Sequence, residues 1–526
     1  MIVSPTPEGL RQETPRRIGD LLRDMEMEVR PGRAAELEAT SITSRSEEVR
    51  PGTLFVALPG TSADGHTFIA DAARRGAAAI LVERDVGGAF DVPLIRVSDA
   101  RKALARLAAR WYGRPAAELE LVGITGTAGK TSTLCLFEAA LIAAGTRVGS
   151  VGSLGINLDG RTLDRSSYTT PDPLLLHREL ARLRDGGAEL VAMEATSHAL
   201  AQRRIHGLTF RMGIFTNLLP LEHSDYHPDF DDYVRSKTLF FEHLEPGAPL
   251  IYNRDDPVTR VLIPYWRLNG ISVGTSNRSM VHLADTVTTA TGTRYSIRVS
   301  SPLPRLAGGT VGPVDLDVRL QLLGPANRMN ASLAAVAALC AGAEPREVKD
   351  ALARFRPPHR RLQVIYRGRF TLLDDTVGHP DSISAFFDVV ARLRPRHVHL
   401  VWAVRGQRGE EINRQNGETL AIWAERLKLE TLVVTRSDGT ADELNRVDDE
   451  EYEAALEPLQ RAGLEVREVP RLEPAVLAAL ERASDGDLVA LLGAQGMDSG
   501  QEIALDWLAA RGEVERSGEA TNATAP

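Results

Sequence analysis

A glycine-rich turn between an apolar run and a helix-like stretch constrains the fold of this chain more than any other feature. Residues 126–132 read Gly-Thr-Ala-Gly-Lys-Thr-Ser; they follow the apolar run 119–124 and precede the helix-like stretch 134–144. Strand, glycine turn and helix in this order are typical of the phosphate-binding loops of α/β proteins. The sequence therefore predicts such a loop at this point of the chain.

The residue types in the turn fit phosphate chemistry. Glycines let backbone N–H groups point at phosphate oxygens, and the start of the helix adds the positive end of its dipole. Lys130 would reach the terminal phosphates, and Thr131 would offer its hydroxyl to Mg²⁺. The strict pattern would have a further glycine where Ile124 stands, so a plain glycine turn with an incidental lysine is the alternative. We predict that the chain binds a nucleoside triphosphate.

Length, charge and cysteine content limit the class of protein. With 526 residues, the chain is expected to form about three domains. Its 62 Lys and Arg against 71 Asp and Glu give a net charge of −9, so nucleic acid is not an expected partner. Cys135 and Cys340 lie in apolar helix-like stretches and are expected to be buried, reduced thiols. No signal peptide and no long apolar run stands out, which predicts a cytoplasmic protein without membrane insertion. The chain is expected to be a monomer.

Apolar runs that alternate with helical stretches predict an α/β fold. The strongest break is Arg356-Pro357-Pro358, since a proline disfavours helix in the residue before it. Beyond it, four apolar runs alternate with helical stretches, as in a doubly wound, Rossmann-like sheet; the runs are 370–373, 398–403, 432–435 and 488–493, and the helices 381–393 and 417–427. Alternation of Thr, Ser, Val and Arg between Val273 and Leu323 predicts β-hairpins. The expected domains are 1–116, 117–356 with a sheet rich in parallel strands, and 357–512, followed by a disordered tail at 513–526.

Acidic and imidazole side chains follow two strand-like runs of the central segment. Glu194 ends the first run and is a candidate Mg²⁺ ligand; a solvated carboxylate at a strand end is the alternative. The second run leads into residues 222–227, which read Glu-His-Ser-Asp-Tyr-His. One histidine among carboxylates would suit Mg²⁺ with waters, whereas His223 and His227 together would suit a transition metal. Further on, Tyr233 and Lys237 fall on one face of a predicted helix, where Lys237 alone would be an ordinary surface lysine.

Taken together, these segments resemble the Mur ligases, ATP-dependent enzymes that add amino acids to the peptide of the peptidoglycan precursor. The closest resemblance is to the third-residue, or MurE-type, UDP-N-acetylmuramoyl-dipeptide ligases. Residues 43–45 and 51–60 resemble the uridine-binding domain of that type, and 168–173, Tyr-Thr-Thr-Pro-Asp-Pro, resemble its substrate loop. Residues 194–200 resemble its Glu-x-x-Ser-His-Ala-Leu segment, and 324–330 its Gly-x-x-Asn-x-x-Asn helix entry.

The resemblance implies roles for individual residues. It implies that ATP is bound by Gly126, Thr127, Gly129, Lys130, Thr131, Ser132, Asn327, Asn330, Arg361 and Asp375. It implies that the UDP-N-acetylmuramoyl-dipeptide substrate is bound by Ser44, Thr169, Thr170, Ser197, Gln202 and Arg204. The implied ligands of Mg²⁺ are Thr131, Glu194, His223 and Lys237. Lys237 would be the carbamylated lysine of the family, and Lys130, Lys237 and His223 would take part in catalysis.

Two segments of the C-terminal part match the family only in part. Arg361 belongs to a stretch similar to the Pro-Gly-Arg segment that opens the third domain, although its glycine is missing. Asp375 belongs to a loop that usually reads Asp-Tyr-Ala-His-x-Pro; here Gly378 holds the histidine position and His379 comes one residue late. The assignment of Asp375 carries over, whereas that of His379 stays open.

The amino-acid side of the site departs further from the family. Ligases of this type that use meso-diaminopimelate carry Asp-Asn-Pro-Arg, but residues 435–442 here read Thr-Arg-Ser-Asp-Gly-Thr-Ala-Asp. Arg436 precedes the loop proper, and Asp438 with Asp442 would suit a cationic side chain such as that of lysine or ornithine. The glycine-rich loop of this side has become 405–411, and the Gly-His-Glu segment has become 493–498.

The reaction implied by the resemblance is ATP-dependent amide formation through an acyl phosphate, giving ADP. The carboxylate acceptor would be UDP-N-acetylmuramoyl-L-Ala-D-Glu and the nucleophile an amino acid. Two alternatives stay open at this point: a Mur-like paralogue with another carboxylate acceptor, and a non-catalytic nucleotide-binding subunit.

Overall fold

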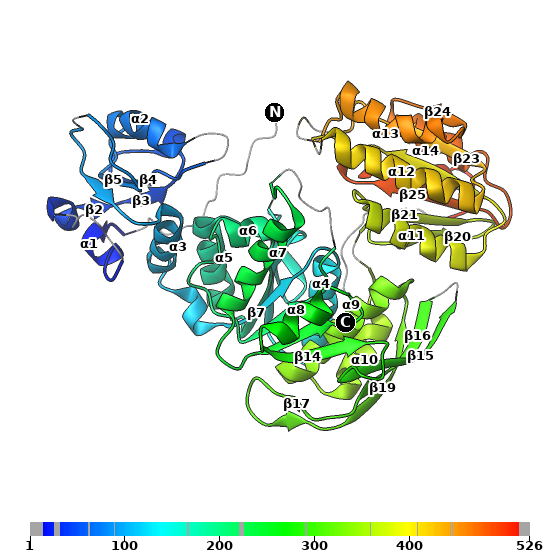
Figure 1. Cartoon of the computed structure of the whole chain (residues 1–526), viewed down its shortest axis with the longest axis horizontal. Coiled ribbons are helices and arrows are strands. Elements are labelled where there is room, and N and C mark those ends of the chain that lie inside the picture. Colours follow the sequence, from blue (N-terminus) through cyan, green and yellow to red (C-terminus); the bar gives the residue numbers. More distant parts are fainter. Residues whose placement is uncertain are drawn as a thin grey trace. The chain divides into compact units, whose positions relative to one another are not determined.

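The computed structural model describes residues 14–25, 32–60, 64–88, 90–165, 168–219, 226–289, 292–357, 359–407, 409–441, 443 and 445–514. The chain forms two compact units, whose helices and strands are labelled in Figure 1. The first comprises Met1–Gly126, Gly145–Phe215 and Asp231–Leu250, and the second Thr127–Ala144, Thr216–Phe230 and Ile251–Pro526. The expected domain boundaries near 116 and 356 remain predictions. Of the expected disordered tail, only 513 and 514 lie among the described residues.

The first unit begins with a small parallel sheet. Its strands follow the order β3 (Ser41–Thr43), β4 (Thr53–Val56), β5 (Ala79–Val82) and β6 (Leu94–Arg96). Every residue of β4 and β5 is buried, as expected for a parallel sheet covered on both faces. The helices α2 (Ile69–Arg74) and α3 (Ala100–Trp111) belong to this part. Both buried strands overlap apolar runs of the sequence, 54–58 and 78–82.

The second sheet of this unit carries the phosphate loop. Its strands follow the order β10 (Arg161–Asp164), β9 (Gly155–Leu158), β8 (Val148–Gly152), β11 (Leu190–Glu194), β7 (Glu120–Thr125) and β12 (Met212–Phe215). Strands β8, β11, β7 and β12 run parallel to one another, and β9 and β10 form an antiparallel edge beside β8. The connecting segments include α5 (Pro173–Asp185), α6 (Ser197–Ala201), α7 (Phe230–Thr238) and η5 (Leu239–His243). The carboxyl ends of β7, β11 and β12 therefore meet at one edge of the sheet, where ligands of open parallel sheets bind.

The second unit contains the helix that follows the phosphate loop. This helix, α4 (Lys130–Ala143), packs against α9 (Pro325–Ala341) and α10 (Pro345–Arg354). Cys340 of α9 is buried as expected, but Cys135 of α4 is only half-buried, so that part of the prediction is wrong; both are free thiols. The remaining elements here are β13 (Pro249–Asn253), α8 (Thr259–Tyr265), β14 (Asn269–Gly274), β15 (Val281–Thr289), β16 (Gly292–Val299), β17 (Leu303–Pro304), β18 (Thr310–Val311) and β19 (Val314–Leu320). Antiparallel pairing of β15, β16 and β19 confirms the expected hairpins.

The C-terminal part of the second unit is a Rossmann-like sheet. Its strand order is β20 (Gln363–Arg367), β21 (Thr371–Asp375), β25 (Leu488–Gly493), β22 (Val398–Ala403), β23 (Thr431–Thr435) and β24 (Val466–Glu468). All pairs are parallel except β20 with β21. Figure 1 shows helices over the sheet; they are α11 (Pro380–Leu393), α12 (Glu410–Leu427), α13 (Asp449–Arg461), α14 (Leu472–Leu480) and α15 (Gly500–Ala509). Two buried apolar clusters form the core of this sheet, which confirms the doubly wound α/β prediction.

Within the described ranges, no helix is long and apolar enough to cross a membrane.

Candidate active site

The predicted phosphate loop is a tight turn between β7 and α4. Strand β7 ends at Thr125, and α4 begins at Lys130, directly after Gly129. Gly129 has φ 84°, and a Cβ atom at this position would lie 2.4 Å from Oδ1 of Asn330. Only glycine fits both the left-handed backbone and the close approach of Asn330. The strand, turn and helix predicted from the sequence are therefore confirmed.

The segment that follows β12 holds this loop in place. Backbone N–H groups of Thr127 and Ala128 donate to the carbonyl and side-chain oxygens of Asn217 at 3.0 and 2.9 Å. The hydroxyl of Thr216 donates to the carbonyl of Ala128 at 2.7 Å. Nζ of Lys130 donates to the carbonyl of Thr127 at 2.6 Å, so the lysine folds back over its own loop. Thr216 and Asn217 shape the loop, although the sequence indicated no more than a strand end there.

The two asparagines at the start of α9 have different surroundings. The helix begins with Gly324, at φ 88°, and Pro325 at its first position. The side chain of Asn327 donates to the carbonyl of Leu323 at 3.0 Å. Asn330 is buried against the phosphate loop, where its amide approaches Gly129. Asn330 thus contributes to the wall of the loop itself.

A second group of predicted residues gathers around Glu194 at the end of β11. Its carboxylate is fully buried, and Oε1 accepts a hydrogen bond from the backbone N–H of Ser153 at 2.9 Å. The hydroxyl of Thr170 donates to the carbonyl of Glu194 at 2.8 Å, and the hydroxyls of Thr169 and Ser153 lie 2.9 Å apart. These contacts tie the predicted substrate loop to the strand end that carries the predicted metal ligand.

Arg204 fixes the other side of this loop. Its guanidinium donates to the carbonyl of Thr170 at 2.9 Å and to Oε1 of Gln202 at 3.0 and 2.8 Å, and it lies over the ring of Tyr168. Ser197, in α6, is fully buried, and its hydroxyl has no hydrogen-bond partner within the described part of the chain. Ser44 is half-buried directly after β3. The structure therefore brings four of the six residues expected at the substrate, Thr169, Thr170, Gln202 and Arg204, into one cluster with Tyr168.

Lys237 is not a surface lysine. It lies in α7 with a relative exposure of 1%, so the interpretation made for the residue alone is wrong. Its Nζ donates to the carbonyl of Gly126 at 2.8 Å and to the hydroxyl of Thr125 at 3.4 Å, and it lies over the ring of Tyr233. Lysine is rarely buried to this degree without a partner or a function. The buried amine contacts the first glycine of the phosphate loop.

The expected metal ligands can be judged only in part. His223, like Glu222 and Asp225, lies outside the described residues. His227 is described and buried, with its ring 5.0 Å from that of Tyr226. No group of three or more His, Cys, Asp and Glu side chains within the described ranges could hold a metal ion. The oxygen donors of Thr131 and Glu194, both buried, are of the chemical type that Mg²⁺ prefers.

In the C-terminal sheet, Arg360 takes the central place. Its guanidinium is buried and donates to the carboxylates of Asp374 and Asp498 and to the carbonyls of Gly493 and Ala494. Its φ of 56° is the left-handed conformation suited to the glycine that the family has in this segment. The sequence indicated only that this glycine was missing, and the structural role of Arg360 was not predicted.

The two residues predicted to bind nucleotide from this sheet flank Arg360. Arg361 is half-buried and lies close enough to Asp375 to lower the pKa of that carboxyl. Burial nonetheless dominates and raises the pKa of Asp375 to about 7, while its Oδ1 accepts from the N–H of Leu362 at 2.9 Å. Burial also raises the pKa of Asp374 to about 6 despite its ion pair with Arg360. His379 caps α11, its ring nitrogen accepting from Asp381 N–H at 3.2 Å.

The amino-acid side of the site is held by contacts of its own. Arg436 pairs with Asp449 and stacks over the ring of Tyr452 at 4.1 Å. Ser437 is fully buried at φ 58°, with a hydroxyl that has no hydrogen-bond partner among the described residues. Asp438 is exposed, and Asp442 lies outside the described residues.

An internal carboxylate occupies the glycine-rich loop of this side. Glu451, buried in the first turn of α13, accepts hydrogen bonds from the backbone N–H groups of Gln407 and Gly409 at 2.9 and 2.6 Å. These two N–H groups are therefore already satisfied within the protein.

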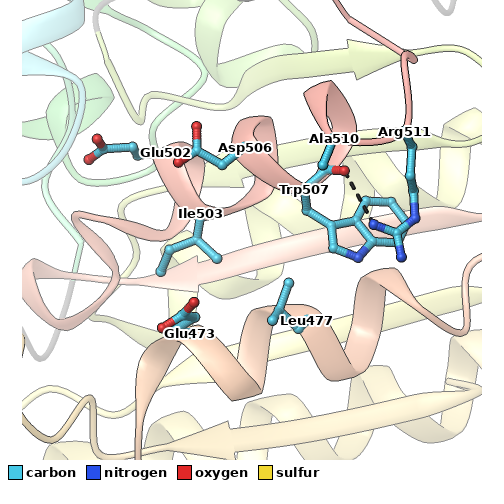
Figure 2. A pocket seen from close by; sticks show the side chains of 8 residues that line it. All are labelled: Glu473, Leu477, Glu502, Ile503, Asp506, Trp507, Ala510 and Arg511. Atoms are coloured by element: carbon cyan, nitrogen blue, oxygen red, sulfur yellow. Dashed lines mark hydrogen bonds between the residues drawn. The ribbon is translucent and has the colours of Figure 1, made fainter.

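Figure 2 shows a surface pocket of about 290 Å³ between α14 and α15. Its walls include the carboxylates of Glu473, Glu502 and Asp506, and Arg511 lies 3.7 Å from the ring centre of Trp507. None of the predicted site residues lines it.

Comparison with known proteins covers most of the chain. Three family descriptions match: the Mur ligase family catalytic domain over 38–112, the Mur ligase middle domain over 124–339, and the Mur ligase glutamate ligase domain over 360–495. The UDP-N-acetylmuramoyl-L-alanyl-D-glutamate–2,6-diaminopimelate ligase of Geobacillus kaustophilus is 32% identical over 468 residues, which cover 88% of this chain and 90% of the relative. The ligase of the same name from Aquifex aeolicus is 32% identical over 88% of this chain and 89% of its own.

A solved structure supports the same architecture. A ligase of that name superposes with a TM-score of 0.66 over 95% of this chain and 100% of its own, at 19% identity. At this identity, the likeness establishes the fold alone.

Proposed function

The chain belongs to the Mur ligase family, and from that membership we propose that it joins an amino acid to a carboxylate of UDP-N-acetylmuramoyl-L-Ala-D-Glu, with ATP converted to ADP and phosphate. Relatives named for this dipeptide acceptor match the chain nearly end to end, which supports the acceptor against a paralogue with another carboxylate. We expect the reaction to take place in the cytoplasm, with the chain as a monomer.

One observation carries the nucleotide half of the proposal: the glycine turn of residues 126–129 is held by Thr216 and Asn217 at the start of α4. In this role Lys130 would exchange its hydrogen bond to the Thr127 carbonyl for one to a phosphate oxygen. Backbone N–H groups and the dipole of α4 would hold the remaining charge. The nucleotide contacts would be completed by Gly126, Thr127, Gly129, Thr131, Ser132, Asn327, Asn330, Arg361 and Asp375.

The metal proposed here is Mg²⁺, with Thr131, Glu194, His223 and carbamylated Lys237 as its protein ligands. Bound Mg²⁺ would neutralise charge on the phosphates of ATP. Buried oxygen donors at Thr131 and Glu194 support this choice over a transition metal.

Lys237 suits carbamylation because it is buried beside the loop. Its neutral amine would form an N–C bond to CO₂ and lose a proton, which replaces a cation by an oxygen anion. Nζ already lies 2.8 Å from the carbonyl of Gly126, so the change would bring a metal-binding oxygen close to the phosphate loop.

The dipeptide would be held by the cluster around Arg204, with Thr169, Thr170, Ser197, Gln202 and, from the small parallel sheet, Ser44. A carboxylate oxygen of the dipeptide then forms a bond to the γ-phosphorus while the bond to the β,γ-bridging oxygen breaks and ADP leaves. The amine of the incoming amino acid attacks the acyl carbon of this acyl phosphate, loses a proton, and displaces phosphate.

The incoming amino acid is proposed to be a diamino acid. The relatives from Geobacillus kaustophilus and Aquifex aeolicus are named as 2,6-diaminopimelate ligases, which favours 2,6-diaminopimelate. In contrast, Arg436 is the arginine nearest the position expected to bind the distal carboxylate of diaminopimelate, and it is held by Asp449 and Tyr452. An amino acid without that carboxylate, such as lysine or ornithine, is therefore favoured.

Phosphate release from ATP tests both halves of the proposal. The full chain is assayed with UDP-N-acetylmuramoyl-L-Ala-D-Glu and, in turn, meso-diaminopimelate, L-lysine, L-ornithine and L-alanine, and product masses are recorded. Release that depends on one diamino acid, with the matching gain in mass, is expected. Measurable ATP binding without release in any mixture would contradict the proposal.

A further inference from the structure

A second cavity, of about 620 Å³, lies in the first unit at the amino ends of β7 and β12. It is lined by the last turns of α3, by residues 114–120, by α5 and by the segment 206–211 before β12. The charged and imidazole residues in its wall are Asp24, Arg106, Arg110, Arg114, Glu120, His177, His206, Arg211 and Glu245.

This cavity is separate from the phosphate loop. Glu120 opens β7, whereas the phosphate loop follows Thr125 at the other end of the same strand of six residues. At about 3.3 Å per residue, the two ends of β7 lie roughly 17 Å apart. The proposed reaction uses no residue of this wall.

The charges in the wall leave cations in excess. Arg211 pairs with both Glu120 at 2.8 Å and Glu245 at 3.3 Å, so this group carries one surplus negative charge, and the whole wall, with four arginines and three carboxylates, has a net charge of +1. Of the other charged residues, three are arginines and one, Asp24, is acidic. Arg106 and Arg110 stand four residues apart on α3, a spacing at which like charges repel.

The guanidinium groups of Arg106, Arg110 and Arg114 have few hydrogen-bond or ion-pair partners within the described part of the chain. Arg110 donates to the carbonyl of Leu21 at 2.7 Å, and burial together with Arg114 and Arg106 lowers the pKa of its guanidinium. For the side chains of Arg106 and Arg114, the described part of the chain offers no hydrogen bond and no ion pair. Their charges are therefore available to a ligand in the cavity.

We propose that this cavity binds a small organic anion through its phosphoryl group, which accepts hydrogen bonds from Arg106, Arg110 and Arg114. A phosphoryl group has three terminal oxygens, enough to accept from several guanidinium groups at once. The cavity exceeds one phosphate in size and suits the volume of an ordinary ligand pocket, so the rest of the ligand is a nucleotide- or sugar-sized body.

The test uses inorganic pyrophosphate as the probe and the full chain at 0.15 M salt, with binding followed by calorimetry. Lys130→Ala removes the lysine of the phosphate loop and leaves this cavity intact, so the chain with this change should still bind one equivalent of pyrophosphate. Adding Arg106→Ser and Arg114→Ser should weaken that binding at least tenfold. Arg346→Ser, which removes an exposed arginine of α10, is the matched control and should leave it within twofold.

Three results would overturn the proposal. The first is complete loss of pyrophosphate binding in Lys130→Ala alone, and the second is equal affinity in the Arg106→Ser/Arg114→Ser and Arg346→Ser chains. The third is citrate binding as tightly as pyrophosphate, which would make the site a carboxylate site.

Discussion

Arg360→Met removes a buried guanidinium and leaves a shorter, unbranched apolar side chain in its place. The change leaves the carboxylate of Asp374, which has no exposed surface, without its ion-pair partner. It also leaves the carbonyls of Gly493 and Ala494 without the donors that lie 2.5 and 2.7 Å away. Removing one partner of a buried ion pair costs about 3–5 kcal/mol.

The cost is limited by protonation of Asp374. Burial already raises the pKa of this carboxyl to about 6 with Arg360 present, so without the guanidinium it would take up a proton at pH 7. We therefore expect a loss near the lower limit, about 3 kcal/mol. For a part of roughly 150 residues, such as the C-terminal sheet with its helices, such a loss lowers the unfolding temperature by roughly 6–12 °C.

Thermal unfolding followed by tryptophan fluorescence measures this loss, because Trp402, Trp423 and Trp507 all lie in the C-terminal sheet and its helices. Arg361→Met is the matched control: its side chain is half-buried and is proposed to bind nucleotide, so activity should fall while the unfolding temperature stays within about 2 °C. An unfolding temperature of Arg360→Met equal to that of Arg361→Met would refute the structural role of Arg360.

Three further predictions concern single residues. Lys237→Ala should lower turnover at least ~100-fold with ATP affinity retained, whereas Lys349→Ala, at an exposed lysine, should leave turnover unchanged. ¹³C NMR of the chain under ¹³CO₂ should show a carbamate carbon that the Lys237→Ala chain lacks. Absence of this signal from the parent chain would contradict the modification. Gly129→Ala forces a side chain into φ 84° and against Asn330, so the dissociation constant for ATP should rise about tenfold, equivalent to ~1.4 kcal/mol, and an unchanged constant would contradict the clash. Burial raises the pKa of Asp375 to about 7 from an unfolded value near 3.9, so the folded chain holds the proton more tightly and this carboxyl lowers the free energy of unfolding as pH rises from about 4 to 7. Asp375→Asn should remove up to ~1.4 kcal/mol per pH unit of that decline in denaturant titrations, and an unaltered slope would refute the raised pKa.

Local patterns in the sequence predicted the strands and the loop because those depend on neighbouring residues. The apolar run 119–124, the glycine turn and the helix after it all appear where expected, with α4 beginning at Lys130. Helix α12 begins seven residues before the expected 417, because Gly409 at φ 88° provides a start that hydrophobic spacing does not mark.

Contacts between distant segments could not be predicted in the same way. Asn217 reaches Ala128 across 89 positions, and Arg360 reaches Ala494 across 134. Nothing in the local sequence distinguishes Arg360 from Arg361; only the backbone conformation places Arg360 inward. The burial of Lys237 was likewise invisible to helical spacing, and the resemblance to a family alone suggested a role for it.

Transfer of an oxygen atom tests the central proposal most directly. UDP-N-acetylmuramoyl-L-Ala-D-Glu labelled with ¹⁸O in the carboxylate that becomes the amide is incubated with the chain, ATP and the accepted amino acid, and the released phosphate is analysed by mass spectrometry. An acyl phosphate carries one carboxylate oxygen into phosphate, so one ¹⁸O atom should appear in phosphate for each amide formed. Unlabelled phosphate, released in step with ATP consumption, would contradict the account.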